Sequence, residues 1–176
     1  MKKIFLFSIL FCLQLVFGQN IPFSKTKEQH FSVVDTANVT LTVLQREPGY
    51  IYGFKYENKP YTHQLMLNPA ETDINEQAER TKKMMQEQIS KDLNPMILDT
   101  ETSKNMMFFD SEGEFIIGFC LTKTPHYLYQ QMLYHPLALH KIQLKKEKPK
   151  ENIILDYKKI NYDIMHKLFS NIKFDK

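Results

Sequence analysis

The chain has 176 residues, a net charge of +3, two cysteines and no tryptophan. This length suffices for one domain with a hydrophobic core, and the small net charge argues against a general nucleic-acid-binding surface. Five glycines are present and no two lie within three residues of each other, which excludes a glycine-rich phosphate-binding loop.

The first 18 residues have the pattern of a cleavable signal peptide. Lys2 and Lys3 form a positive start, and an apolar stretch shorter than the roughly 20 residues of a membrane span follows them. Val16 and Gly18 occupy the −3 and −1 positions of a signal-peptidase site. Cleavage removes two lysines and no acidic residue, so the net charge falls from +3 to +1. We expect an exported protein, periplasmic or secreted, without a transmembrane span after processing; a retained anchor helix is the alternative.

The segment after the predicted cleavage site divides into a polar lead-in and one domain. Residues 19–29 are polar and predict a loose lead-in, and residues 30–176 predict a single domain. Within the domain, Val39, Leu41 and Val43 alternate with less apolar neighbours, which is the period of a β-strand.

A β-hairpin is predicted next, with arms Tyr50–Tyr56 and Tyr61–Leu67 around a turn at residues 57–60. The first arm places four aromatic side chains on one face: Tyr50, Tyr52, Phe54 and Tyr56. Such a stripe is either the half-buried, helix-facing side of a sheet or a binding face, because tyrosine is enriched at interfaces. We take the stripe as the candidate binding site.

The residues from Asp73 to Leu93 predict an amphipathic helix. Apolar and small residues recur at intervals of three and four, at Ile74, Ala78, Thr81 and Met85. Asp73 and Glu76 have the spacing of a capping box, and the Asn94-Pro95 pair ends the helix. The charged opposite face is expected to contact solvent.

Further strands are predicted after the helix. Residues 95–100 favour a short strand, and Met106–Phe109 pairs with residues 114–123 around a turn at 110–113. The segment Tyr127–Tyr134 fits either a strand or a helix, and we favour a strand followed by another at Ala138–Leu144.

The last segment predicts a helix that begins at Asp156 or Asn161 and ends at Ser170, followed by an extended tail at Asn171–Phe174. The predicted fold class is therefore α+β: an antiparallel β-sheet with an amphipathic central helix and a C-terminal helix packed on it.

This order of elements resembles the PsbP/Mog1-like family. The similarity lies in the early hairpins, the helix Asp73–Leu93, the meander Met106–Leu144 and the closing helix with the sequence LFSNIKF, Leu168–Phe174. The resemblance implies an α+β sandwich of two or three layers. It also implies a non-catalytic role, since members of that family are mainly docking and assembly proteins, and it transfers no functional residue to this chain.

Cys120 is the one cysteine that remains after signal cleavage. It is a buried apolar residue, an interchain disulfide partner or a reactive thiol, and its place among apolar neighbours in a strand favours burial. One face of this strand carries Ile117, Phe119 and Leu121 and should meet the helices. The other face carries Gly118 and Cys120, and would border a binding groove if the chain left it open.

Metal and catalytic motifs are weak in this sequence. His126, His135 and His140 could meet at one end of the sheet, although scattered surface histidines are the simpler interpretation. H-E-x-x-H, paired cysteines and G-x-S-x-G are absent. We expect no metal and no cofactor.

Adjacent methionines, Met84-Met85 and Met106-Met107, should each place one member outward. The basic stretch Lys141–Lys150 fits a solvated loop better than a docking patch.

The sequence predicts an exported, non-catalytic binding or assembly module of the periplasm or cell envelope. Its partner would be a protein or a small ligand, and not a nucleic acid. The alternative is a small exported hydrolase that uses Cys120 or a histidine-centred site.

Overall fold

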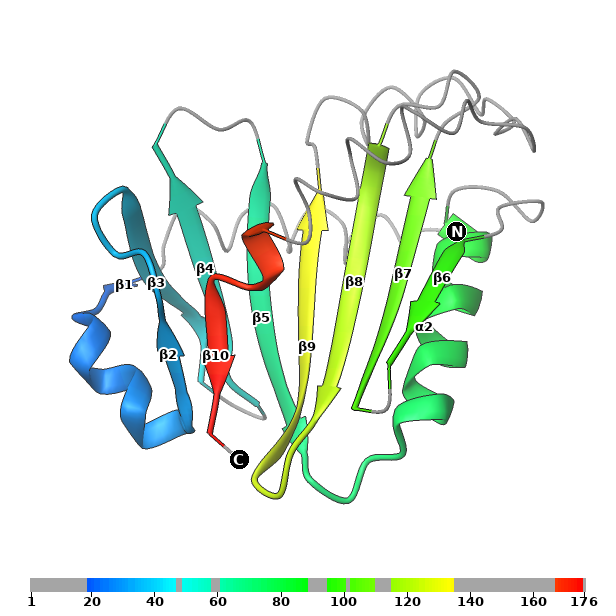
Figure 1. The fold of residues 1–176 in the computed structure, drawn as a ribbon, viewed down its shortest axis with the longest axis horizontal. Helices are drawn as coiled ribbons and strands as arrows, with labels where there is room; N and C mark the ends of the chain where they lie inside the picture. Colours follow the sequence, from blue (N-terminus) through cyan, green and yellow to red (C-terminus); the bar gives the residue numbers. More distant parts are fainter. Residues whose placement is uncertain are drawn as a thin grey trace.

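An eight-stranded antiparallel sheet dominates the computed structural model, which describes residues 19–46, 49–57, 61–88, 95–100, 102–109, 115–134 and 167–175. The strand order is β1-β3-β4-β5-β9-β8-β7-β6, and a separate two-stranded sheet pairs β10 with β2 (Figure 1). The strands are β1 (Gln19–Asn20), β2 (Phe31–Val33), β3 (Val39–Gln45), β4 (Ile51–Tyr56), β5 (Thr62–Pro69), β6 (Met96–Asp99), β7 (Ser103–Phe109), β8 (Phe115–Lys123), β9 (Tyr127–Tyr134) and β10 (Ile172–Phe174). The 3₁₀-helix η1 (Phe23–Gln29) and the helix α2 (Ile74–Gln88) complete the described elements. This mostly antiparallel sheet with a few helices fits the predicted α+β class.

The predicted early strands are confirmed. β3 pairs with β4, and β4 pairs with β5 as a hairpin in which Phe54 is opposite His63 and Tyr52 is opposite Leu65. The alternation of Val39, Leu41 and Val43 places these side chains on one face, where the first two are buried.

The ambiguous segment Tyr127–Tyr134 is a strand, as favoured above. β9 pairs with β5 along one edge and with β8 along the other, so that it lies inside the sheet. Pairing on both sides satisfies the backbone amide and carbonyl groups of this buried segment. A helical turn at this place would leave the facing backbone groups of β5 and β8 without these partners. The hairpin of β7 and β8 and the short strand β6 are confirmed as well.

The helix α2 covers one face of the sheet near β8. Ala78 and Met85 pack in a buried cluster with Ile117, Phe119 and Leu121 of β8, as the apolar spacing predicted. At the N-terminus of α2, Asp73 Oδ1 accepts hydrogen bonds from the backbone amides of residues 75 and 76, both at 2.9 Å. The side chain of Glu76 instead accepts a hydrogen bond from Arg80, so the described geometry contains the N-cap half of the predicted capping box.

The opposite face of the sheet is covered by β2, β10 and the turn before β10. Phe31 and Ile172 are buried there in one cluster with Tyr52, Leu65 and Tyr129. Figure 1 shows β2 and β10 in front of the sheet strands, with α2 beside β6. Two layers of chain therefore cover the sheet, one on each face.

The expected loose lead-in differs from the structure. Residues 19 and 20 pair with β3, and residues 23–29 form η1. The hydroxyl of Tyr129 donates to the backbone carbonyls of Gln29 and His30, at 2.9 and 3.0 Å, which fixes the end of η1 to β9. A polar sequence without helical periodicity did not reveal this short 3₁₀ segment.

The methionine prediction is half right. On α2, Met84 is 39% exposed while Met85 is 2% exposed, as a helix surface requires. On β7, Met106 and Met107 are both buried, at 3% and 1%, because both faces of the sheet are covered there. The expectation of one outward member is therefore wrong for this pair.

The predicted signal peptide, the strand at 138–144, the basic stretch at 141–150 and the helix before residue 167 lie outside the described residues. Residues 167–169 are helical and Asn171 is in a turn. The predicted extended tail is confirmed for Ile172–Phe174, which form β10. Within the described ranges, no helix combines the length and apolar character needed to cross a membrane.

Candidate functional site

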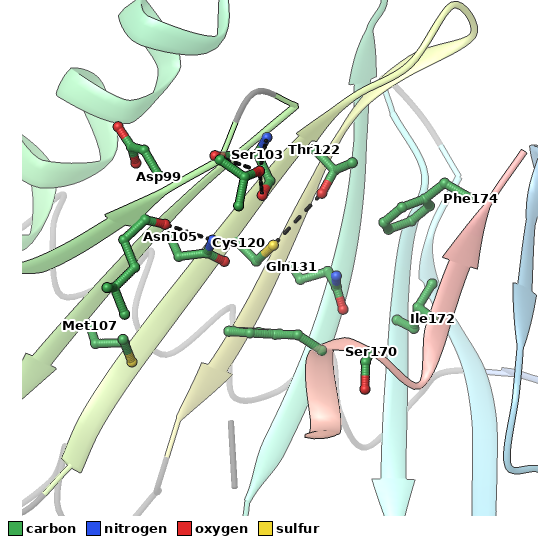
Figure 2. A pocket seen from close by; sticks show the side chains of 13 residues that line it. Asp99, Ser103, Asn105, Met107, Cys120, Thr122, Gln131, Ser170, Ile172 and Phe174 are labelled. Carbon is green, nitrogen blue, oxygen red and sulfur yellow. Dashed lines mark hydrogen bonds between the residues drawn. The ribbon is translucent and has the colours of Figure 1, made fainter. Parts of the chain in front are cut away.

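A cavity of about 380 Å³ lies between the sheet and the C-terminal segment (Figure 2). The sheet contributes nine lining residues from β6, the turn after it, β7, β8 and β9: Leu98, Asp99, Thr100, Ser103, Asn105, Met107, Cys120, Thr122 and Gln131. The C-terminal segment contributes four more: Phe169, Ser170, Ile172 and Phe174. A volume of this size falls in the range of small-molecule pockets.

The floor of the cavity is a row of polar and weakly polar side chains across three adjacent strands. Asn105 of β7 is in register with Cys120 of β8, and Cys120 is in register with Gln131 of β9. Since side chains opposite each other in register share a face, all three lie on the side of the C-terminal segment. Neighbouring strands are about 4.8 Å apart, so Asn105 and Gln131 start about 10 Å from each other.

The C-terminal segment forms the apolar wall. Phe174 stacks on Tyr129 with a ring-centroid distance of 4.1 Å, and Phe169 meets the ring of His63 edge-on at 5.9 Å. Asn171 joins this segment to the second residue after β2: its Oδ1 accepts from the amide of Asp35 at 2.7 Å and its Nδ2 donates to the carbonyl of Asp35 at 3.3 Å. The wall is thus held both by the segment after β2 and by aromatic contacts with the main sheet.

A buried histidine lies behind the polar floor. His63 has no solvent exposure, and burial lowers its pKa to about 4 against a smaller opposing effect of the hydrogen bond with Gln131. The ring is therefore neutral at physiological pH. Its Nε2 lies 3.0 Å from Gln131 Oε1 and its Nδ1 lies 2.7 Å from the hydroxyl of Tyr56.

The two hydrogen bonds define the tautomer. Gln131 Oε1 can only accept, so Nε2 of His63 carries the proton and donates. The other ring nitrogen of a neutral imidazole is an acceptor, so the hydroxyl of Tyr56 donates to Nδ1. Burial raises the pKa of Tyr56 to about 12, against a smaller opposing effect of the hydrogen bond with Asn171. The raised pKa keeps this hydroxyl protonated.

The thiol of Cys120 lines the cavity but is not activated. Burial raises its pKa to about 11, and the only smaller opposing influence is the hydroxyl of Thr122 at 3.7 Å. A nucleophilic cysteine requires a lowered pKa and a base within hydrogen-bond reach. Both ring nitrogens of His63 are engaged by other residues, so the described geometry contains no thiol–imidazole pair at this position.

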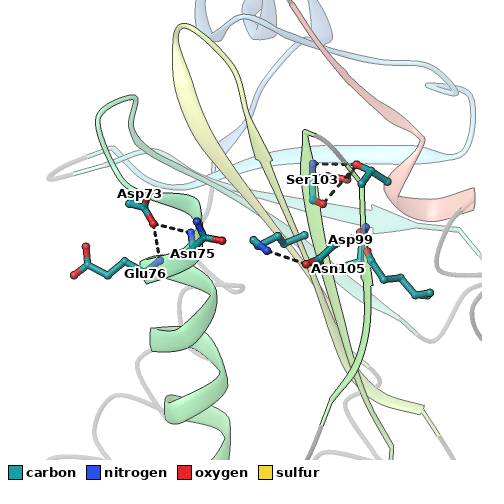
Figure 3. Close-up of polar contacts among 9 residues, drawn as sticks. Asp73, Asn75, Glu76, Asp99, Ser103 and Asn105 are labelled. Carbon is teal, nitrogen blue, oxygen red and sulfur yellow. Dashed lines mark hydrogen bonds and ion pairs between the residues drawn. The ribbon is translucent and has the colours of Figure 1, made fainter.

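Charge is nearly absent from the lining. Asp99 is the charged member of the described lining set, and Lys104 Nζ lies 2.8 Å from its Oδ2. Figure 3 shows this ion pair at the β6–β7 edge, away from the N-cap of α2 at Asp73. Beside it, the hydroxyls of Thr100 and Ser103 are 2.7 Å apart. No basic residue occurs among the described lining residues, so the cavity offers no countercharge to an anion.

The aromatic stripe proposed as a binding face lies mostly in the core. Tyr52, Phe54 and Tyr56 are 3%, 2% and 7% exposed, and only Tyr50 is partly accessible. Tyr52 packs against the ring of Phe31 at 5.1 Å, so β2 covers the stripe and leaves no open platform. Tyr56 still matters for the cavity, because it positions His63.

Of the three histidines considered as a possible cluster, the structure describes only His126. His126 stacks on His30 with ring centroids 3.6 Å apart, and neither lines the cavity. His135 and His140 lie outside the described residues. Within those residues, no group of three or more histidine, cysteine or carboxylate side chains could hold a metal ion.

Three residues of the site were not predicted from the sequence: His63, Gln131 and Asn105. A signal was present for two of them. His63 shares a strand face with Leu65 and Leu67, and Gln131 lies on the face of β9 that also carries Tyr129 and Leu133. A polar residue on an otherwise apolar strand face indicates a buried hydrogen-bonded group.

Fold and cavity together define an antiparallel α+β protein in which the C-terminal segment closes a small-molecule-sized cavity over the sheet. No protein-family model matches the chain, and no similar curated protein or solved structure was found by comparison.

Proposed function

We propose that this protein is an exported, non-catalytic module that binds a small ligand in the cavity between the sheet and the C-terminal segment. The observation that carries the proposal is the cavity itself: about 380 Å³, walled by Met107, Phe169, Ile172 and Phe174, with a polar row on its floor. Ligand pockets typically combine apolar walls with a few placed polar groups.

The chemistry of the lining favours binding over hydrolysis. The thiol of Cys120 has a raised pKa and lies beside Thr122 without a base. His63 is neutral, buried and engaged at both nitrogens. Among the described residues, the arrangement of Cys120 and His63 therefore gives the hydrolase alternative no support.

The proposal includes export through the predicted signal peptide and a relationship to the PsbP/Mog1-like family. Residues 1–18 have the sequence of a signal peptide, so the module would act in the periplasm, at the envelope or outside the cell. An antiparallel sheet with a helix on one face is compatible with a PsbP/Mog1-like sandwich, whose members are mainly non-catalytic. Cell fractionation of the tagged chain tests export: a full-length product retained in the cytoplasm would contradict it.

Ligand binding is tested with a small apolar probe and a variant that blocks the cavity. We would titrate p-xylene into the purified protein and follow side-chain methyl and amide signals by NMR. Ser170 is exposed and lines the cavity, whereas Lys167 is exposed on the same turn and does not. Ser170→Trp should abolish saturable binding, and Lys167→Trp should preserve it. Equal binding of p-xylene to both variants, or absence of saturable binding to the wild type by p-xylene and by the polar probes described below, would overturn the proposal.

A further inference from the structure

We infer that the cavity selects an uncharged, two-ended ligand: an aromatic or similarly flat body with a hydrogen-bond acceptor at the end facing Gln131 and a donor at the end facing Asn105. This inference rests on the proposed binding function and specifies the chemistry of the ligand. It follows from the orientation of two side-chain amides, the row that they form and the charge of the lining.

The first step concerns Gln131, which is 2% exposed and lines the cavity. Its Oε1 is committed to His63 Nε2 at 3.0 Å. The other polar atom of the amide, Nε2, is then the one left for the cavity, which this side chain lines (Figure 2). An amide nitrogen is a donor only. The β9 end of the floor therefore offers a donor and calls for an acceptor on the ligand.

Tyr56 and His63 set this polarity without contacting the cavity. The hydroxyl of Tyr56 donates to His63 Nδ1, which leaves the ring proton on Nε2 and holds Oε1 of Gln131 inward. Both are positioning residues, because they act on the ligand through the amide of Gln131.

The second step concerns Asn105, at the other end of the row. Its Nδ2 donates to the backbone carbonyl of Leu98 at 2.8 Å. Its Oδ1 is the remaining polar atom of the amide, and carbonyl oxygens only accept. The β7 end of the floor therefore offers an acceptor and calls for a donor on the ligand.

The spacing of the two ends limits the ligand. Asn105 and Gln131 are separated by one strand, which is about 10 Å between backbones. Two hydrogen bonds of about 2.9 Å leave roughly 4 to 7 Å between the donor and acceptor of the ligand. A single amide group is too short for this span, whereas opposite substituents of one six-membered ring match it. Cys120 lies between the ends and presents a weakly polar sulfur, which suits contact with an aromatic ring.

The charge of the lining excludes an anionic ligand. Among the described lining residues none is basic, and the carboxylate of Asp99 lies at the edge with Lys104 as its partner. An anion would lose its hydration without gaining a countercharge, which is costly in an apolar site. The preferred ligand is neutral.

The test uses five probes with one ring and matched size: 4-hydroxybenzamide, p-toluamide, p-cresol, 4-hydroxybenzoate and p-xylene. The first has both ends; p-toluamide lacks the phenol donor, p-cresol lacks the carbonyl acceptor, 4-hydroxybenzoate carries a charge and p-xylene has neither end. We expect 4-hydroxybenzamide to bind most tightly. Each missing end should weaken binding about 3- to 10-fold, as expected for one net hydrogen bond, and 4-hydroxybenzoate should bind more weakly than p-cresol.

A variant at each end assigns the contacts. Gln131→Met keeps the length of the side chain and removes the donor, so it should weaken 4-hydroxybenzamide and p-toluamide while leaving p-cresol unchanged. Gln130→Met is the matched control, because Gln130 is adjacent and faces α2, where it accepts from Gln77 at 2.7 Å. Asn105→Leu should weaken 4-hydroxybenzamide and p-cresol and leave p-toluamide unchanged; it carries the test if Gln131→Met does not fold.

The outcomes separate the two proposals. If p-xylene binds and the four polar probes bind no better, or if 4-hydroxybenzoate binds best, the ligand class inferred here is wrong while the cavity remains a binding site. If none of the five probes binds, the proposed binding function fails and the inference fails with it. The expected ranking together with end-specific losses in the two variants would establish the inference.

Discussion

His63 Nε2 lies 3.0 Å from Gln131 Oε1, and this contact joins a histidine with no solvent exposure to the floor of the cavity. The two residues come from adjacent strands, β5 and β9, which are far apart in the sequence. Burial holds the ring of His63 neutral, and the hydrogen bonds with Tyr56 and Gln131 hold it in a single tautomer. The buried contact therefore couples the stability of the core to the polarity of the site.

The burial of His63 predicts a loss of stability in acid. Its pKa is lowered from about 6.5 in the unfolded chain to about 4 in the folded protein. The unfolded state binds the proton more readily than the folded state does. The contribution of the neutral His63 ring to the free energy of unfolding is therefore complete above about pH 6.5 and is lost as pH falls to about 4. A difference of this size corresponds to about 3 kcal/mol. Urea unfolding at pH 7, 6, 5 and 4 measures it.

A variant isolates this effect from the titration of carboxylates. His63→Gln should be less stable than the wild type at pH 7 and should lose less stability between pH 6.5 and 4. His126→Gln, an exposed position outside the network, should follow the wild-type profile. Parallel pH profiles for His63→Gln and the wild type would show that the ring is not buried in its neutral form.

The thiol of Cys120 should react slowly in the native protein. Its pKa of about 11 leaves about 100-fold less thiolate at pH 8 than a thiol with the ordinary value of 9 has. Restricted access at 7% exposure slows the reaction further. Labelling with a disulfide reagent, with and without urea, measures both rates. A native rate within 10-fold of the unfolded rate would contradict this account and would revive the reactive-thiol interpretation.

The periodic elements could be predicted from the sequence because local patterns determine them. Alternation predicted β3 and β4, and spacing of three and four predicted α2, whose buried residues Ala78, Thr81 and Met85 are those of the predicted stripe. The outcome for β9 depended on its partners. Tyr127–Tyr134 fits either period, and pairing with β5 and β8 decides in favour of a strand.

The site depends on contacts that no local pattern contains. The cavity exists because the C-terminal segment pairs with β2 and so lies over the middle of the main sheet. The sequence predicted the extended tail but not its partner strand. Asn105, Cys120 and Gln131 become neighbours only through the register of three strands, and Cys120 alone attracted attention in advance. The covered second face also explains why Met107 is buried and why Cys120 is both core and cavity lining.

Lys123 should stabilise the connection between β5 and α2. Its Nζ donates to the backbone carbonyl of Ala70, and also to that of Thr72 at 2.6 Å. Lys123→Met keeps the apolar stem and leaves both carbonyls without this cation, so we expect a loss of about 1 to 3 kcal/mol. Lys83→Met, at an exposed position of α2, should change stability by less than about 0.5 kcal/mol. Chemical unfolding compares the two, and equal effects would assign Lys123 no special role.

Asn171 should control how firmly the C-terminal segment closes the cavity. Its side chain accepts from the amide of Asp35 and donates to the carbonyl of the same residue, while its backbone carbonyl accepts from the amide of Val34 at 2.8 Å. Asn171→Ala removes these two side-chain bonds and the side-chain contact with Tyr56, and leaves the backbone bond. We expect a modest loss of global stability, about 1 kcal/mol, and a larger effect on local opening.

Local opening is measured by hydrogen exchange at the amide of Val34, which is protected only while the segment is in place. In Asn171→Ala this amide should exchange about 5- to 10-fold faster than in Lys173→Ala, a change at an exposed position of β10. Amides of β8 and β9 should be unaffected, because the main sheet does not depend on the two-stranded sheet for its hydrogen bonds. Faster exchange throughout the main sheet would mean that the segment is an integral part of the core and does not open separately from it.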